Sequence, residues 1–407
     1  MMNINRTPPP MRLPGGQRVQ LRGAAPPARR ARHSRFMAHG LSYALASAFN
    51  AASQRAANTL ARLSLTLAGL ASLQAQSQAQ TANLPQGGVA VHGAATMQQN
   101  GTTLNVNTTN GSGNRSIINW QSFNVGAGHT TNINQPNAAS SSLNRVVTNV
   151  PSQIHGTLRS NGQVILVNQN GIAVGAGGVV DTAGFTASTL NISDADYKAK
   201  RLRFEGNSLS GGVQVDGVIR SQNGDVVLFA PNVATGKDAF VKADNGNVIV
   251  GAGQSVEVTG RGLEGVKFLI QSADNKAINL GTLQGNAVGV FAGTLRHSGV
   301  ISAQTATMEG GRVVLRAVKD VEIVKDATLA KAPVIEANGG VNAAGVAQKG
   351  GSIQIESNQG NVTIGAGSSI TANAAYLGQN QPHAGINAAG GAIEIIANQG
   401  RVVTEAG

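Results

Sequence analysis

The sequence predicts an all-β protein: a right-handed parallel β-helix (solenoid) with small β elements outside the helix, preceded by a cleaved leader. Three observations predict this fold. Short apolar runs alternate with Asn-Gly or Gly-Gly pairs from residue 100 onward, as in Val164–Val167 before Asn170-Gly171. Apart from a polar excursion at 193–203, no long helical stretch separates these runs, which excludes the βαβ route to parallel strands. The last third of the chain repeats with a period of 40 residues.

The amino-acid composition suits such a fold. The chain has 407 residues, with 53 Gly, 12 Pro, no Cys and only 9 Phe, 3 Tyr and 1 Trp. Abundant Val, Ile, Ala, Asn and Gly favours short strands joined by tight turns. Because Cys is absent, structural disulfides and thiol catalysis are excluded.

Residues 1–79 are expected to form a long basic leader with a signal peptide. They hold ten Arg and no Lys, Asp or Glu, whereas residues 80–407 carry a net charge of only +2. The apolar run 63–73 is shorter than the roughly 20 residues that span a bilayer. A basic segment, a short apolar run and small residues ending at Ala79 predict secretory cleavage after Ala79. Translation from Met37 and a buried helix in a cytosolic protein remain open alternatives.

The turns and the repeat assign the strands. Asn-Gly supplies a positive φ at low cost, so each such pair predicts a tight corner. Gly310-Gly311, Gly350-Gly351 and Gly390-Gly391 each precede an alternating apolar run, at an offset of 40 residues. We expect two coils of roughly 20 residues per repeat and about 16 coils in all, stacked at about 4.8 Å. The rivals are an antiparallel sandwich and a β-propeller, whose aromatic signature a single Trp cannot supply.

The interior of the coils is expected to be aliphatic. We place there Ile117, Val164, Leu166, Ile172, Val227, Leu228, Ile249, Val314, Ile353, Ile355, Ile393 and Ile395, with Trp120 and Phe123 filling one coil. Asn side chains at successive corners should stack as ladders that satisfy their amides. Asp194 and Asp196, in the polar excursion, are expected to begin a helix or a turn.

Eight sequence blocks follow one another between residues 83 and 196. They are 83–88 (NLPQGG), 116–126 (SIINWQSFNVG), 134–137 (NQPN), 143–146 (LNRV), 151–158 (PSQIHGTL), 161–164 (NGQV), 168–172 (NQNGI) and 187–196 (ASTLNISDAD). In this order they resemble the secretion domain of two-partner secretion exoproteins, the filamentous-haemagglutinin-like family. The resemblance makes residues 80–310 the two-partner secretion domain. Residues 311–407 are then expected to be the start of a β-helix repeat region that is truncated, because the third repeat copy stops at Gly407.

The resemblance implies a secretion mechanism. A signal peptide takes the chain across the inner membrane of a Gram-negative bacterium. A partner outer-membrane transporter with periplasmic receptor domains then recognises the secretion domain and exports the chain. The protein folds outside, secreted or at the cell surface, as an adhesin or haemagglutinin that meets a host-cell or surface glycan or protein. A partly extended domain with unpaired strand edges can bind the receptor by strand addition.

The resemblance also assigns residues to transporter recognition: Asn119, Trp120, Asn134, Pro136, Asn137, Arg145, Asn168, Gln169, Asn170 and Gly171. One departure concerns the last four, because the family usually has Asn-Pro-Asn-Gly where this chain has Gln169 at the second position. Proline there fixes φ, so Gln169 should make the corner less rigid. Asn170 and Gly171 keep the turn chemistry, and we expect the turn to form.

The charge pattern leaves two interpretations of receptor binding. Residues 80–180 contain no Asp or Glu but carry Arg115, Arg145 and Arg159. A slightly positive segment that meets an acidic receptor surface and a chance bias on a solvated face are equally open. Since the strong basicity belongs to the leader, the sequence does not predict nucleic-acid binding.

The sequence predicts no catalytic, cofactor-binding or metal site, and the chain is not expected to be an enzyme. Its carboxylates begin at Asp181 and are scattered, whereas glycan-cleaving β-helices need clustered carboxylates. The seven His show no metal-ligand spacing. Two alternatives remain open. One is a secreted β-helix enzyme acting on polysaccharide, which clustered surface carboxylates would favour. The other is the amino-terminal part of a haemolysin or contact-dependent toxin, whose effector would lie beyond this sequence.

Overall fold

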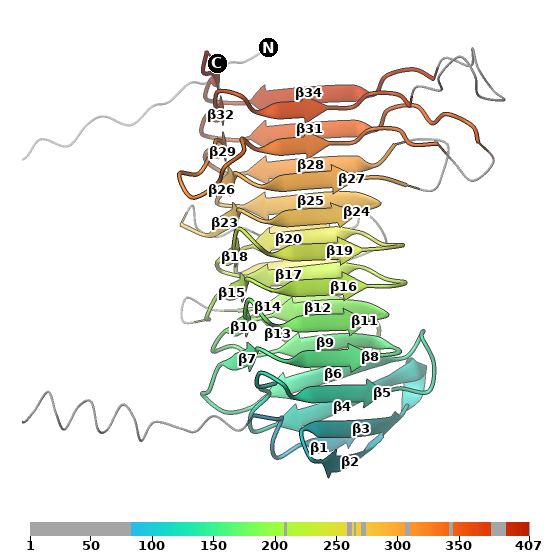
Figure 1. Ribbon diagram of the computed structural model, residues 1–407. Helices are drawn as coiled ribbons and strands as arrows, with labels where there is room; N and C mark the ends of the chain where they lie inside the picture. The colour runs from blue at the N-terminus through green and yellow to red at the C-terminus, as the bar shows by residue number, and fades with distance from the viewer. Residues whose placement is uncertain are drawn as a thin grey trace, which may run out of the picture. The chain divides into compact units, whose positions relative to one another are not determined.

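The strands of the protein stack into a parallel β-helix, seen in the computed structural model (Figure 1). The structure describes residues 83–206, 210–258, 263, 266–269, 274–305, 310–341, 345–375 and 388–406. The expected leader, with its signal peptide and cleavage site, lies outside the described residues. Two described helices interrupt the strands: the 3-10 turn η1 (Ser112–Asn114) and α2 (Asp194–Lys198).

Three long sheets form the walls of the helix. Sheet I contains, in spatial order, β1 (Val89–His92), β4 (Arg115–Trp120), β6 (Ser141–Val146), β9 (Gln163–Val167), β12 (Gly184–Ser188), β17 (Val226–Ala230), β20 (Val248–Ala252), β25 (Ala287–Ala292), β28 (Arg312–Ala317), β31 (Ser352–Ser357) and β34 (Ala392–Ala397). Sheet II contains β2 (Ala94–Asn100), β3 (Thr103–Thr109), β5 (Thr130–Asn134), β8 (Thr157–Ser160), β11 (Val179–Thr182), β16 (Val218–Ser221), β19 (Phe240–Ala243), β24 (Thr282–Gly285), β27 (Val300–Ala303), β30 (Val334–Glu336) and β33 (Ser369–Thr371).

Sheet III is the third wall, and sheet IV lies outside the helix. Sheet III contains β7 (Ser152–Ile154), β10 (Ile172–Val174), β15 (Val213–Val215), β18 (Val233–Thr235), β23 (Lys276–Asn279), β26 (Thr294–His297), β29 (Val321–Ile323), β32 (Val362–Ile364) and β35 (Val402–Thr404). Sheet IV is antiparallel and contains β13 (Asn191–Ile192), β14 (Leu202–Glu205), β21 (Ser255–Val258) and β22 (Val266–Leu269). The chain visits sheets III, II and I in turn, so each coil has three strands.

The expected coil count is wrong. Val226 pairs with Val248, only 22 residues later, in the middle of the stack. In the repeat region, however, Ser352 pairs with Arg312 on one side and with Ala392 on the other, so 40 residues make one coil and not two. The additional residues lie in connections between strands, such as the one from β30 to β31. Sheet I has eleven strands, of which β1 runs antiparallel, so the described stack is shorter than 16 coils.

Six of the twelve aliphatic residues expected inside the coils are buried there, and four others point outward from sheet I. Val164, Leu166, Ile172, Leu228, Ile353 and Ile355 belong to the buried cluster inside the coils, against which Ile395 packs. Ile117, Val227, Ile249 and Val314 instead point outward from sheet I into a second cluster. Ile118 takes the interior place beside Trp120 and Phe123, which are buried there as expected. Ile393 is 45% exposed, since no described strand stacks beyond β34 in sheet I.

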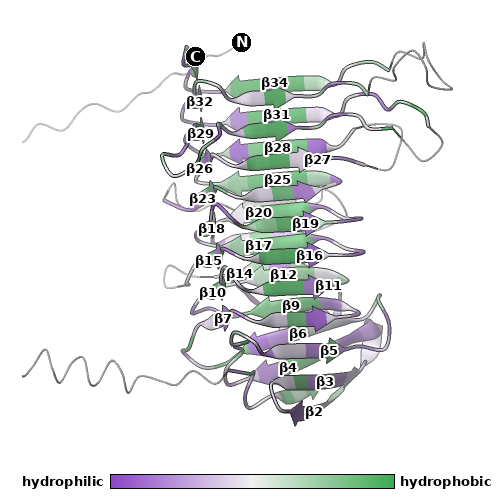
Figure 2. Cartoon of the chain, in the orientation of Figure 1, coloured by the Kyte–Doolittle hydropathy of each residue, from purple (hydrophilic) through white to green (hydrophobic). Residues whose placement is uncertain are grey.

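The second cluster explains this error. Sheet IV and α2 pack on the outer face of sheet I through Ile192, Tyr197, Phe204 and Val256. Sheet I therefore buries apolar side chains on both faces over its central strands, as in Val164–Val167, all four buried. In Figure 2 the sheet I strands β17 and β20 are hydrophobic, whereas the sheet II strands β3 and β5 are more hydrophilic. Asp194 and Asp196 lie in the first turn of α2, where Ser193 Oγ accepts a hydrogen bond from the Asp196 backbone N–H at 3.0 Å.

Positive φ is not what the central Asn-Gly corners require. Among the described glycines, Gly171 has φ +120°, but Gly224 and Gly246 do not have a positive φ. A Cβ on Gly246 would lie 2.2 Å from the carbonyl oxygen of Gly224 in the preceding coil. Glycine is needed there because the backbones of stacked corners approach too closely for a side chain.

Asn side chains stack on one another between neighbouring strands, whereas at a corner Asn245 contacts the neighbouring coil through its backbone, with Nδ2 donating to the Gln222 carbonyl oxygen at 2.9 Å. Asn132 Nδ2 donates to Asn105 Oδ1 at 2.9 Å, and Asn134 Nδ2 donates to Asn107 Oδ1 at 2.8 Å, between neighbouring strands of sheet II. These contacts satisfy amides along the polar outer face. Within the described residues, no helix is long and apolar enough to cross a membrane.

Candidate transporter-recognition surface

Arg145 and Asn119 lie side by side on the outer face of sheet I. They are paired across β4 and β6. Arg145 donates from Nη2 to the Ile192 carbonyl oxygen at 2.6 Å, and its Nη1 lies 2.8 Å from Asp194 Oδ1 and 3.5 Å from Asn119 Oδ1. The Arg145 side chain is only 16% exposed. In the folded domain it therefore holds the segment of β13 and α2 against the coil.

Trp120 faces the interior of the same coil. Its side chain is buried, and its ring meets Phe123 edge-on at a centroid distance of 5.6 Å. The indole Nε1 donates to Asn144 Oδ1 at 3.0 Å, and Asn144 Nδ2 donates to Ser142 Oγ at 3.2 Å. An indole N–H that is buried without an acceptor destabilises the folded state. The hydrogen bond to Asn144 therefore removes the main energetic penalty of burying Trp120. A partner of the folded domain cannot reach Trp120.

Asn134, Pro136 and Asn137 lie at the end of β5 and in the corner that follows it. All three are exposed. Asn137 Oδ1 accepts from the backbone N–H of Ala139 at 3.0 Å and from Ser140 Oγ at 3.2 Å, a local turn held by its own side chain. Asn134 belongs to the ladder described above. Asn134 and Asn137 thus make hydrogen bonds within the domain and are also exposed to a transporter.

The corner of Asn168–Gly171 forms a turn, as expected, despite Gln169. The Gly171 backbone N–H donates to the Asn168 carbonyl oxygen at 3.2 Å. Asn168 is fully buried; its Nδ2 donates to the Val150 carbonyl oxygen and to Ser152 Oγ, both at 2.9 Å, and its Oδ1 accepts from the Asn170 backbone N–H at 3.0 Å. The Asn168 side chain thus fixes two neighbouring corners. Gln169 itself is exposed.

The structure brings some of these residues together. Arg145, Gln169 and Asn170 line one pocket of about 270 Å³, with Asn191 and Val147. Asn134, Pro136 and Asn137 do not line this pocket, and Trp120 lies inside the coil. Sequence reasoning missed Asp194, Asn144 and Ser152 as partners of the expected residues. Their positions inside or beside the eight sequence blocks between residues 83 and 196 could have pointed to them.

The three arginines of the acid-free segment meet acidic or aromatic partners from later coils. Arg145 pairs with Asp194, and Arg159 lies opposite Asp181 in the next strand of sheet II. The guanidinium carbon of Arg115 lies 4.5 Å from the ring centroid of Tyr197, whose hydroxyl donates to Ser141 Oγ at 2.9 Å. Burial raises the pKa of the Tyr197 hydroxyl. In the folded domain, the carboxylates that residues 80–180 lack are thus supplied by Asp181 and Asp194, which follow in the sequence.

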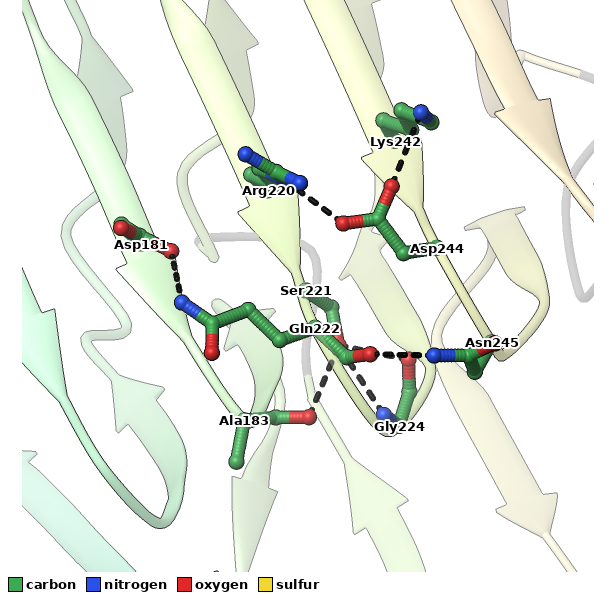
Figure 3. A network of polar contacts seen from close by, with 9 residues as sticks. All are labelled: Asp181, Ala183, Arg220, Ser221, Gln222, Gly224, Lys242, Asp244 and Asn245. Atoms are coloured by element: carbon green, nitrogen blue, oxygen red, sulfur yellow. Dashed lines mark hydrogen bonds and ion pairs between the residues drawn. The ribbon is translucent and has the colours of Figure 1, made fainter.

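Sheet II continues this alternation of charge (Figure 3). Arg220 Nε lies 2.7 Å from Asp244 Oδ2, and Lys242 Nζ lies 2.8 Å from Asp244 Oδ1. Hydrogen bonds from Lys242 and Arg220 hold the pKa of the Asp244 carboxyl below its usual value. Within the part of the chain that the structure describes, no three His, Cys, Asp or Glu side chains gather as metal ligands would.

A family profile described as "TPS secretion domain", for two-partner secretion, matches residues 79–329. The Heme/hemopexin-binding protein of Haemophilus influenzae (strain ATCC 51907 / DSM 11121 / KW20 / Rd) is 28% identical over 230 residues, which are 56% of this chain and 23% of that protein. Another Heme/hemopexin-binding protein of Haemophilus influenzae is 29% identical over 140 residues, 34% of this chain and 15% of that one. The chain spans less than a quarter of the length of these curated relatives.

One solved structure shares the fold. The HMW1 secretion domain from Haemophilus influenzae superposes with a TM-score of 0.60 at 28% identity, covering 79% of this chain and 84% of that one. The filamentous hemagglutinin secretion domain gives a TM-score of 0.42 at 16% identity, covering 80% of this chain and 99% of that one. Because the profile covers more than half of its length, the chain belongs to the family of TPS secretion domain exoproteins, which are secreted by Gram-negative bacteria.

Proposed function

We propose that residues 80–310 carry the address that a partner outer-membrane transporter reads through its periplasmic receptor domains, and that the exported chain then acts as a surface adhesin. The match of residues 79–329 to the TPS secretion domain carries this proposal. Signal-peptide export to the periplasm would precede recognition. The corner of Asn168–Gly171 and the exposed Asn134, Pro136 and Asn137 would present the address.

The docking edge for the receptor is strand β1. It is the terminal strand of sheet I and pairs only with β4, antiparallel, so no described strand occupies its other edge. Val89 and Val91 on β1 are 61% and 49% exposed. An exposed edge with apolar side chains favours the addition of a further strand. A receptor strand would therefore extend sheet I beyond β1.

The test is export of the chain with and without a co-expressed partner transporter, followed by blotting of medium and periplasm. Partner-dependent appearance of a product that begins near Gln80 is the expected result. Export without a partner, or retention in the cytoplasm, would contradict the addressing role.

The docking edge is tested with Val89→Lys combined with Val91→Lys. Charged side chains on an edge strand oppose strand addition, and both positions are exposed, so the fold should tolerate them. We expect export to fall at least tenfold. Val341→Lys is the matched control, because Val341 is 52% exposed and lies beyond the matched region. Equal export of the double variant and the control would remove β1 as the docking edge and leave the partner dependence intact.

A further inference from the structure

A slot of about 370 Å³ lies between the outer face of sheet I and sheet IV. Leu202 and Val258 of sheet IV and Val227 of sheet I line it with apolar atoms and are only partly buried. Phe204 and Phe229 stand behind them, with ring centroids 5.6 Å apart. This volume lies within the roughly 300–1,000 Å³ typical of small-ligand sites.

The slot runs across the strands of sheet I. Its outward column passes from Arg115 through Ser141, Gln163 and Gly184. Asp225, which precedes the partner of Phe185, continues the column. Arg115 and Asp225 are therefore four strand spacings apart, about 19 Å at about 4.8 Å each. Gly184 lines its centre beside Gln163, and no positive φ explains a glycine at that position. The space suits an elongated ligand.

Arg115 places a guanidinium at one end of the slot. Its Nε is buried and has no hydrogen-bond partner, and among the described residues its guanidinium makes no ion pair. The face of Tyr197 holds the group in place, 4.5 Å from the ring centroid. A planar guanidinium fixed in this way is suited to a carboxylate.

The other end of the slot is a rim of amides at two stacked corners. Asn223, Asn245 and Asn247 line it, with Asp225. Asp225 Oδ1 accepts from the Asn247 backbone N–H at 2.8 Å and from Asn247 Nδ2 at 3.0 Å. Asn245 Nδ2 donates to the Gln222 carbonyl oxygen at 2.9 Å, which ties the two corners together (Figure 3). The rim is thus held in place before any ligand arrives.

We propose that this slot binds an acidic oligosaccharide. The carboxylate of one sugar meets Arg115, the hydroxyl groups of the next sugars meet the amide rim, and their C–H faces lie on Val227 and Leu202. A fatty acid would place its apolar tail against the amides and Asp225. Within the slot, a peptide strand would find no free backbone edge, because β14 and β21, the described strands of sheet IV that line it, are each paired on both sides. The inference concerns the folded domain and does not rest on the export proposal; it would give the surface role a ligand.

The experiment titrates the full purified chain by calorimetry with trigalacturonate and with 3′-sialyllactose. Their uncharged counterparts, the trigalacturonate methyl ester and lactose, are the reference ligands. We expect at least one acid to bind tenfold or more tightly than its neutral counterpart. No binding of either acid, or equal binding of acid and counterpart, would overturn the proposal, and so would preferential binding of laurate.

Three variants locate the site. Arg115→Gln should remove the preference for the acid, while Arg159→Gln, the same change on the exposed face of sheet II, should keep it. Gly184→Val suits a strand and fills the slot without a change of charge, so it should abolish binding of acid and neutral ligand alike. Unchanged affinity in both Arg115→Gln and Gly184→Val would place binding elsewhere. Circular dichroism of each variant shows whether it is folded. If Arg115→Gln does not fold, the site is judged from the binding of Gly184→Val alone.

Discussion

The Nη1 atom of Arg145 lies 2.8 Å from Oδ1 of Asp194, and this pair joins the coil to the segment outside it. The same guanidinium donates to the Ile192 carbonyl oxygen, so one side chain binds both β13 and the start of α2. A residue that the family resemblance assigns to transporter recognition thus fastens the folded secretion domain. Recognition of the domain before folding and fastening after it are compatible uses of Arg145.

Arg145→Met should loosen β13 and α2. Hydrogen bonds to a charged group contribute about 2 kcal/mol, so local opening should rise roughly 30-fold. Lys198, Lys200 and Arg201, all exposed in this segment, are the trypsin sites that report the opening. Arg159→Met is the matched control and should leave the cleavage rate unchanged. Equal rates for the two variants would show that Arg145 does not hold the segment.

Asn168→Ala should destabilise the corner between sheets I and III. The change removes two donated hydrogen bonds and two accepted from Asn170, and leaves buried partners unsatisfied. We expect a loss of about 2–4 kcal/mol in the free energy of unfolding. Denaturant titration followed by circular dichroism measures it. Asn170→Ala, at an exposed position, is expected to cost less than half as much, and the reverse order would contradict the role given to Asn168.

Gln169→Pro restores the residue that the family usually has at this position. Proline fixes φ and reduces the freedom of the unfolded chain, so a gain of up to about 1 kcal/mol is expected. No described backbone acceptor takes the Gln169 N–H within a turn or strand. The midpoint of thermal unfolding gives the sign. A clear decrease would mean that Gln169 adopts a conformation closed to proline.

Ile355→Asp should melt the coils around β31. Ile355 is fully buried inside the coil, and an unpaired carboxylate there is strongly unfavourable. Gln354→Asp, on the same strand but with its side chain outward, is the control. We expect rapid proteolysis of residues 310–375 in the first variant only. Equal resistance of both variants would contradict the register of sheet I.

His297 should make the stability of the protein fall in mild acid. It is fully buried, Nδ1 lies 3.1 Å from Asn279 Nδ2 and Nε2 lies 3.2 Å from the Val334 carbonyl oxygen. Burial lowers its pKa from 6.5 to about 4. Between these values the unfolded chain binds the proton and the folded protein does not, so stability is lost as pH falls through that window. The loss is about 2 kcal/mol at pH 5.

The variant His297→Gln isolates this effect. Glutamine offers an acceptor and a donor in place of the two ring nitrogens but does not titrate. The difference in unfolding free energy between pH 7 and pH 5 should therefore shrink by about 2 kcal/mol relative to the original protein. An unchanged difference would mean that other groups cause the acid sensitivity.

The sequence by itself determined the strands, the corners and the family. Apolar runs between Asn-Gly and Gly-Gly pairs locate the strands correctly, because strand and turn preferences act over a few residues. The ordered blocks between residues 83 and 196 identified the secretion domain. Local patterns also found the start of α2 and the buried Trp120.

Only the tertiary structure decided which way the strands of sheet I face. Alternation of apolar and polar residues along a strand identifies the inner face when solvent contacts the outer face. Sheet IV covers the outer face of sheet I, so apolar residues lie on both faces. Ile117 and Ile118 are equally hydrophobic, and packing against sheet IV or against the coil interior distinguishes them. The same holds for coil length, since a residue offset of 40 does not reveal how much of it leaves the helix as a loop. The partners of Arg145, Trp120 and Asn168 come from other coils or segments, and long-range stacking alone brings them together.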